Sequence, residues 1–195
     1  LSINGLRLRN RLALPPITTN YAAADGTATE ATVAFHRLRS RHVGLTIVEA
    51  AAVRADGRIT PYSLGIWSDD QLPGLASLAA AIKAEGAAAF IQINHAGARS
   101  QPFAEGLRGA SPSGFAFRQD VEPTALDQAQ IDEIVADYVA AAERAARAGF
   151  DGVEIHGAHF YLICQFLSSL TNARDDRYGG DAAARATFGV EVTRA

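Results

Sequence analysis

The sequence lacks several features that would place the protein in a specialised class. Its 195 residues contain one cysteine, Cys164, so no disulfide can form within the chain, which fits a reducing compartment. It contains no apolar run long enough to cross a bilayer and no secretory signal. Acidic and basic residues nearly balance at a net charge of −3, which gives no reason to expect binding to nucleic acid or to an anionic membrane. These absences predict a cytoplasmic globular protein.

Two further absences concern the ends of the sequence. It contains no methionine and opens with Leu1. A helical pattern at Ala182–Thr193 has no Gly, Asn or Pro after it to end the helix. We therefore expect the natural polypeptide to extend beyond both ends.

Short apolar segments alternate with longer helical patterns along the chain. A short segment that is nearly continuous in Val, Ile, Leu and Ala is typical of a strand covered on both faces. The predicted strands are Arg11–Pro15, Leu45–Ala50, Ala88–Asn94 and Gly152–His156, and the predicted helices are Glu30–Arg41, Leu72–Glu85, Asp127–Ala148 and Ala182–Thr193.

The third predicted helix has the clearest pattern. Asp127 and Gln130 have the spacing of a capping box at its start, and Gly149 can end it. Its apolar side chains recur at helical spacing and predict one buried face, formed by Ile131, Ile134, Val135, Tyr138, Val139, Ala142 and Ala146.

The alternation of strands and helices predicts an α/β fold with parallel pairing and right-handed crossovers. Residues 1–195 form a single domain of four βα units, which make either a small open sheet or the first half of a (β/α)8 TIM barrel, C-terminally truncated. The Gly- and Pro-rich connection 96–126 is too long to be inert. Because it follows the third strand, it is expected at the edge where barrel active sites form.

Polar side chains gather where the predicted strands end. Taken singly, each has a structural explanation: a buried amide can satisfy backbone groups, and Glu154 is expected to pair with a buried cation. Together they converge on one edge of a parallel sheet, and this convergence indicates a site. These side chains are Thr18 and Thr19 after the first strand, Gln92 and His95 at the third, and Glu154, His156, His159 and Tyr161 at the fourth.

The last three of these residues suggest a reaction. His156 and His159 can both donate hydrogen bonds to one oxygen and stabilise negative charge that develops on it. Tyr161 can then deliver a proton to the neighbouring carbon. Such groups suit reduction of a conjugated C=C bond, for which a cofactor must supply the hydride. The chain has no G-x-G-x-x-G motif and no P-loop to bind a nucleotide.

At this point a family resemblance becomes specific. Five segments resemble, in the same order, those of the Old Yellow Enzyme family of FMN-dependent ene-reductases. They are RNRLALPPITTN (Arg9–Asn20), GLTIVEAAAV (Gly44–Val53), LGIWSDDQLPG (Leu64–Gly74), IQINHAGARS (Ile91–Ser100) and AGFDGVEIHGAHFYLICQFLSSLTNARDDRYGG (Ala148–Gly180).

The resemblance implies an NAD(P)H:flavin oxidoreductase with FMN across the barrel mouth and NADPH or NADH as reductant. An enone-type substrate, an α,β-unsaturated carbonyl compound, would receive hydride from the flavin at its C=C bond. His156 and His159 would hold its carbonyl oxygen and Tyr161 would supply the proton, so these three are the catalytic and substrate-binding residues. The implied cofactor-binding residues are Pro16, Ile17, Thr18, Ala50 and Gln92.

Two departures from the family pattern and two alternatives remain. Thr18 stands where one subgroup has a cysteine, and Phe160 stands where many relatives have glycine. One alternative is a metal-dependent TIM-barrel hydrolase with His156 and His159 as ligands and His95 as a third. The other is a half-barrel that is inactive alone, does not hold FMN tightly, and assembles with the missing C-terminal half or a second copy.

Overall fold

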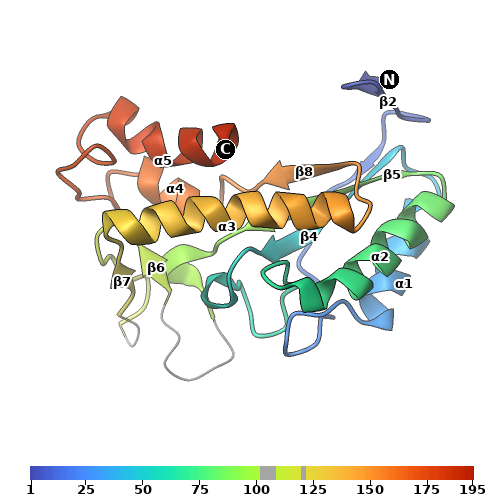
Figure 1. Cartoon of the computed structure of the whole chain (residues 1–195), viewed down its shortest axis with the longest axis horizontal. Coiled ribbons are helices and arrows are strands. Elements are labelled where there is room, and N and C mark those ends of the chain that lie inside the picture. The colour runs from blue at the N-terminus through green and yellow to red at the C-terminus, as the bar shows by residue number, and fades with distance from the viewer. Residues whose placement is uncertain (102–108, 120–121) are drawn as a thin grey trace.

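The computed structural model describes residues 1–101, 109–119 and 122–195. Its centre is a four-stranded parallel sheet whose spatial order follows the chain order. All carboxyl ends therefore lie at one edge, as in the wall of a barrel (Figure 1). The strands are β3 (Ala13–Leu14), β4 (Leu45–Ala52), β5 (Ala88–Asn94) and β8 (Gly152–Ile155).

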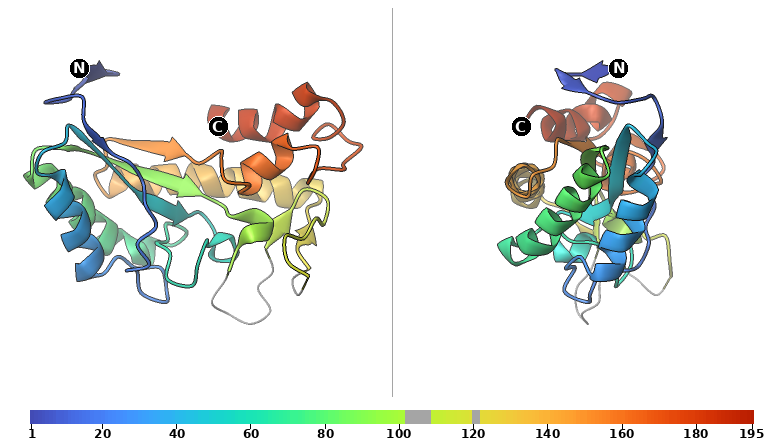
Figure 2. Two further views of the ribbon diagram at one scale, coloured as in Figure 1. Left: turned by 180° about the vertical axis from the view of Figure 1, so that it is seen from behind. Right: turned by 90° about the vertical axis from the view of Figure 1, so that its right-hand side faces the viewer.

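Three helices pack against one face of this sheet, each lying between successive strands in the chain (Figures 1 and 2). They are α1 (Glu30–Ser40), α2 (Leu72–Ala84) and α3 (Gln128–Arg147). After β8 the chain forms α4 (Leu162–Leu167) and α5 (Ala182–Arg194), and α5 packs on α4 and α3. The buried core consists of apolar side chains from the helix-facing side of the strands and from these helices, among them Ile91, Leu78 and Ile131.

Smaller elements lie at the two ends of the sheet. β1 (Ser2–Ile3) and β2 (Leu6–Arg7) form an antiparallel hairpin far from α4 and α5 (Figure 1). At the carboxyl edge, β6 (Ala110–Ser111) and β7 (Thr124–Ala125) pair in parallel within the long connection after β5. The 3-10 turns are η1 (Ala55–Gly57), η2 (Asp69–Gln71) and η3 (Gly97–Arg99). Residues 102–108 and 120–121 of the predicted loop 96–126 lie outside the described residues.

The predicted strands and helices are confirmed with small changes of boundary. The largest change is at Arg11–Pro15, where the strand covers only Ala13–Leu14. Pro15 and Pro16 lack the N–H group that would continue the ladder with β4. At the other edge strand the ladder continues past its last residue, because the backbone N–H of His156 donates to the carbonyl of Ile93 at 3.1 Å.

The capping box of α3 is confirmed, but the predicted apolar face is partly wrong. The Asp127 side chain accepts a hydrogen bond from the Gln130 backbone N–H, and Oε1 of Gln130 accepts one from the Asp127 backbone N–H. Ile131, Ile134 and Tyr138 are buried as predicted, yet the face continues through Ala141 and Ala145 rather than Ala142 and Ala146. A row of residues four apart drifts by roughly 40° around a helix at each step, so over 20 residues it leaves the buried side.

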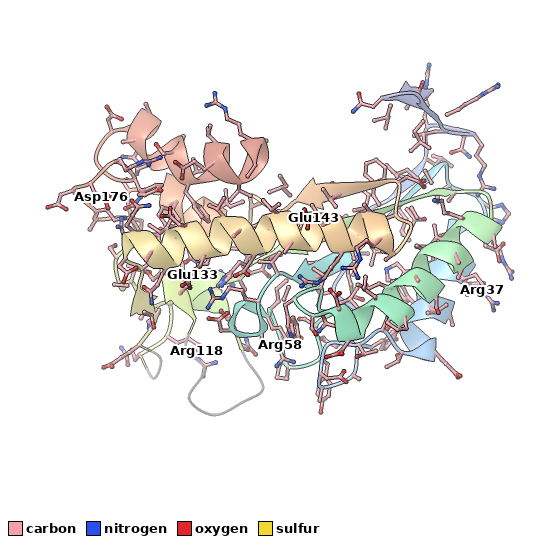
Figure 3. The ribbon with its side chains drawn as sticks, viewed as in Figure 1. Arg37, Arg58, Arg118, Glu133, Glu143 and Asp176 are labelled. Atoms are coloured by element: carbon pink, nitrogen blue, oxygen red, sulfur yellow. The ribbon has the colours of Figure 1, made fainter. Side chains whose placement is uncertain are left out.

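None of the helices in the described ranges is both long enough and apolar enough to span a bilayer. The longest, α3, carries exposed carboxylates such as Glu133 and Glu143 along its length (Figure 3). The predicted cytoplasmic location stays a prediction.

Candidate active site

The sheet face opposite the helices, called the inner face below, carries polar side chains on three adjacent strands. Glu49, Gln92 and Glu154 lie near the carboxyl ends of β4, β5 and β8. Gln92 is paired with Glu154 in the parallel register, and its Nε2 donates to Glu154 Oε1 at 2.7 Å. Within the described residues, Glu154 therefore has an amide partner in place of the buried cation that we predicted. The side-chain amide of Gln92, which lies alongside Glu154 on β5, donates a hydrogen bond to the carboxylate.

Glu49 is a site residue that the sequence prediction missed. Its side chain is fully buried and accepts hydrogen bonds from Thr19, from the backbone N–H at 3.1 Å and from Oγ1 at 2.5 Å. Burial raises the pKa of the Glu49 carboxyl, although the bonds from Thr19 oppose this. The pair fixes the segment after β3 across the end of β4. A single carboxylate in the otherwise apolar run LTIVEAAA was the available signal.

His156, His159 and Tyr161 form one cluster immediately after β8. The ring centroids of His156 lie 5.0 Å from His159 and 4.9 Å from Tyr161, and the remaining pair is 6.0 Å apart. His156 follows Glu154 by two residues, and side chains two apart in an extended strand point to the same face. The cluster therefore lies on the side of the sheet that carries Gln92, at the edge where the sequence predicted it.

The hydrogen bonds of the cluster define which ring nitrogens carry protons. Ala158 donates its backbone N–H to Nδ1 of His156 at 3.1 Å, so the proton of neutral His156 is on Nε2. That Nε2 lies 3.2 Å from Nδ1 of His159, which must then accept. The remaining proton of His159 is on its Nε2 and is free to donate outward. The hydrogen-bond chain that starts at the Ala158 N–H and passes through His156 thus ends at the Nε2–H donor of His159.

Burial tunes two of these groups toward their neutral forms. It lowers the pKa of His156 to about 4, with the nearby charge of His159 adding to the effect, so this imidazole is uncharged at neutral pH. Burial also raises the pKa of Tyr161, partly opposed by the positive charge of Arg99. The phenol therefore keeps its proton at neutral pH.

Two consecutive residues of the cluster have a left-handed backbone. His159 has φ 56° and Phe160 has φ 53°, a conformation that costs a non-glycine residue about 1–2 kcal/mol. The buried side chain of Gln165 holds this turn, because its Nε2 donates to the Phe160 carbonyl at 2.6 Å. The same amide binds the backbone of Ala96 and Ala98 in the turn after β5. The strained backbone of His159 and Phe160 is thus stabilised by a hydrogen bond from the buried side chain of Gln165.

The residues implied to contact FMN lie at the same edge. Pro16 and Thr18 are half-buried, Ile17 is exposed, and Ala50 is buried near the end of β4. Within the described part of the chain, the backbone N–H groups of Ile17 and Thr18 donate to no acceptor. Free N–H groups, small flat side chains and the Gln92 amide suit a planar ring that has hydrogen-bonding edges. These residues fit a flavin.

His95 does not join the histidine cluster. Its Nδ1 accepts the backbone N–H of Gly97 at 3.0 Å, and its Nε2 faces Oδ1 of Asp56 at 3.6 Å. The described residues contain no group of three His, Cys, Asp or Glu side chains arranged to hold a metal ion. His95, the third ligand that the hydrolase alternative requires, therefore faces Asp56 rather than His156 and His159.

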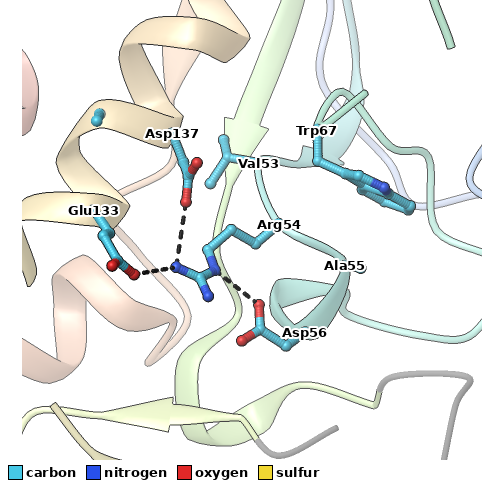
Figure 4. A pocket seen from close by; sticks show the side chains of 8 residues that line it. Val53, Arg54, Ala55, Asp56, Trp67, Glu133 and Asp137 are labelled. Carbon is cyan, nitrogen blue, oxygen red and sulfur yellow. Dashed lines mark hydrogen bonds and ion pairs between the residues drawn. The ribbon is translucent and has the colours of Figure 1, made fainter. Parts of the chain in front are cut away.

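A second polar cluster lies between the loop after β4 and α3, at a pocket of about 540 Å3 (Figure 4). Arg54 is its centre and contacts Asp56 at 3.2 Å, Asp137 at 3.4 Å and Glu133 at 3.7 Å. Burial raises the pKa of the Asp137 carboxyl, and the charge of Arg54 opposes this. Trp67 closes another side of the pocket.

A parallel barrel wall that presents a neutral imidazole with a second histidine beside it, a protonated phenol and a flavin-compatible surface at its carboxyl edge is typical of a flavin-dependent oxidoreductase. The chain belongs to the NADH:flavin oxidoreductase / NADH oxidase family, whose model matches residues 1–195.

Relatives and solved structures agree with this assignment. The chain is 40% identical over 198 residues to the NADPH dehydrogenase of Clostridium acetobutylicum, covering 100% of this chain and 57% of the relative. The structure of Old Yellow Enzyme from Pichia sp. AKU4542 superposes with a TM-score of 0.94 at 29% identity, over 100% of this chain and 54% of that one. Morphinone reductase in complex with tetrahydroNAD gives 0.86 at 34% identity, over 96% and 56%. The chain thus spans about half the length of these proteins.

Proposed function

We propose that the chain forms half of the active site of an FMN-dependent ene-reductase. The whole protein would pass hydride from NADPH or NADH, through FMN, to the C=C bond of an α,β-unsaturated carbonyl compound. The observation that supports this most directly is the contact among His156, His159 and Tyr161 on the face of the sheet that carries Gln92. Bound FMN would supply the hydride chemistry.

Pro16, Ile17, Thr18, Ala50 and Gln92 are the residues of this chain that would hold the flavin. The free backbone N–H groups of Ile17 and Thr18 can donate to the ring. Gln92 has one N–H committed to Glu154, which leaves its second N–H and its carbonyl oxygen for a partner with both donors and acceptors. Thr19 keeps this segment in place through the buried carboxylate of Glu49.

His156 and His159 would bind the carbonyl oxygen of the substrate. Without substrate, His156 donates its Nε2 proton to His159. A carbonyl oxygen can take the place of that acceptor and accept hydrogen bonds from the Nε2–H groups of both rings. These two hydrogen bonds stabilise the negative charge that forms on the oxygen as hydride arrives. Because the pKa of His156 is lowered to about 4, the imidazole acts as a neutral donor at physiological pH. Tyr161, protonated and in contact with both rings, would deliver the proton to carbon.

The edge strands β3 and β8 would pair with the remainder of the barrel. Both are end members of the described four-stranded sheet, and an unpaired strand edge is a template for further pairing. Residues 1–195 alone are therefore expected to lose FMN during gel filtration, whereas the whole protein retains it. A yellow, monomeric fragment with tightly bound FMN would contradict this part of the proposal.

The central test uses the whole purified protein under anaerobic conditions. The visible flavin absorbance should bleach on addition of NADPH or NADH and return on addition of cyclohexenone. If the flavin absorbance bleached but did not return with cyclohexenone, enone reduction would be ruled out. The reduced flavin would then pass its electrons to an acceptor of another class. A colourless protein with stoichiometric zinc would support the hydrolase alternative instead.

A further inference from the structure

One side of the candidate active site is formed by aromatic rings from two separate loops. The ring of Phe160 packs edge-to-face on Phe117 at 5.9 Å, and Phe117 packs likewise on Phe115 at 5.1 Å. Phe160 lies between His159 and Tyr161 in the chain, so this wall begins on the turn that carries the proposed substrate-binding groups. We call Phe115, Phe117 and Phe160 the aromatic wall.

Arg99 supplies a positive charge at this wall. Its guanidinium carbon lies 5.4 Å from the centroid of Phe117. Arg99 is exposed, and no carboxylate in the described ranges forms an ion pair with it. Its charge reaches the cluster, because it opposes the rise in the pKa of Tyr161. An arginine stacked on a ring keeps its planar N–H edge free for a bidentate acceptor such as a carboxylate.

The position of Arg99 is fixed relative to the catalytic turn. It ends the η3 turn, whose residue Ala98 and N-cap Ala96 bind the buried amide of Gln165. The same amide holds the carbonyl of Phe160. Gly97, between them, has φ 62°, and a Cβ there would lie 2.5 Å from Gln165 Oε1, so the turn admits no larger residue. The turn that carries Arg99 and the backbone of Phe160 are therefore held by one buried side chain.

We propose that Arg99 and the aromatic wall make this site selective for α,β-unsaturated carbonyl substrates that carry a carboxylate. This inference rests on the proposed ene-reductase function and specifies its substrate class. The carboxylate would pair with the Arg99 guanidinium, while the conjugated carbons lie against Phe117 and Phe160. His156 and His159 would still bind the conjugated carbonyl.

The test compares two substrates of nearly equal shape, 4-oxopent-2-enoate and its neutral carboxamide, in the whole FMN-loaded protein. The wild type should have the higher kcat/KM for the carboxylate. Arg99→Gln should lower that value about 10- to 100-fold, mostly through KM, and change the carboxamide little. Arg99→Lys should retain part of the preference, because it keeps the charge but not the planar fork.

Arg37→Gln is the matched control, because Arg37 is an exposed arginine on α1, far from the carboxyl edge (Figure 3). It should leave both substrates unchanged. Equal kcat/KM for the two substrates in the wild type, or an equal loss for both in Arg99→Gln with an intact flavin spectrum, would overturn the inference alone. Failure of the wild type to reduce cyclohexenone as well would instead overturn the proposed function.

Discussion

Two polar clusters lie at the carboxyl end of the sheet, and they differ in how their groups are satisfied. Around Arg54, one guanidinium forms ion pairs with three carboxylates of the same cluster (Figure 4). In the cluster of His156, His159 and Tyr161, burial favours the neutral forms of two groups, and donors remain available. Groups that remain available can bind a substrate, whereas paired groups connect one part of the fold to another.

The size of a pocket is a poor guide to which of these clusters is functional. The pocket beside Arg54 measures about 540 Å3 but lies between the β4 loop and α3, away from the inner face. The histidine cluster lies on an edge that, in a full barrel, would be enclosed by further strands. We therefore propose that the chemistry takes place at the inner face and that the Arg54 cluster stabilises the fold.

The largest expected effect is that of removing both imidazoles. His156→Ala/His159→Ala in the whole protein should lower kcat/KM for cyclohexenone about 10^3-fold, because two donors to the developing oxyanion are lost. Steady-state kinetics with NADPH would measure this. Asp137→Asn in the other cluster is the control and should change kcat/KM less than twofold. An equal loss in both variants would contradict the division of roles.

Loss of the phenol proton should have the next largest effect. Tyr161→Phe keeps the ring contact with His156 but removes the proposed proton donor, so kcat for enone reduction should fall about 10^2-fold. Rapid-mixing measurements should show an unchanged rate of flavin reduction by NADPH, because this half-reaction needs no proton from Tyr161. A fall in both half-reactions would instead indicate a structural role.

The neutral state of His156 should make stability depend on pH. Its pKa is lowered from 6.5 to about 4 in the folded protein, so the unfolded chain binds this proton more tightly. The stabilising contribution is complete above about pH 6.5 and is lost as the pH falls toward 4. Urea unfolding should show a loss of roughly 2 kcal/mol over that range that is absent in His156→Gln. Parallel pH profiles for the two proteins would contradict this.

The Arg54 cluster should affect stability alone. Arg54→Ala removes ion pairs that join the β4 loop to α3, and partly exposed pairs of this kind contribute about 1 kcal/mol to the free energy of unfolding. Urea unfolding would measure the loss, and Arg37→Ala on α1 is the comparison variant with an exposed arginine. A change in kcat/KM larger than threefold in Arg54→Ala would contradict the prediction that this cluster affects stability alone.

Much of the fold could be predicted from the sequence because its core strands are apolar and its helices are amphipathic. The elements that were missed are too short to show a period. The six residues of α4 and the two-residue strands β6 and β7 are examples, since they are stabilised by neighbours that are distant in the chain. The α3 face at Ala141 and Ala145 was missed for a different reason, because a row of residues four apart drifts off the buried side of a 20-residue helix.

The site was predictable as a set of residues, but its internal bonds were not. The convergence of Gln92 and His156 at one edge follows from parallel pairing and needs only the strand order. The partners of Glu154 and Glu49 depend on register and on the path of the chain after β3, which sequence spacing does not specify. The roles of these residues toward FMN and substrate stay predictions.

The amide of Gln165 has a consequence for how such an enzyme can change. One side chain holds backbone groups from the connections after both β5 and β8. Shifting either connection to admit a new substrate therefore disturbs the other. Laboratory evolution of this site should accumulate paired substitutions, one in each connection, and should seldom find a gain from a single change near residue 97 or 160.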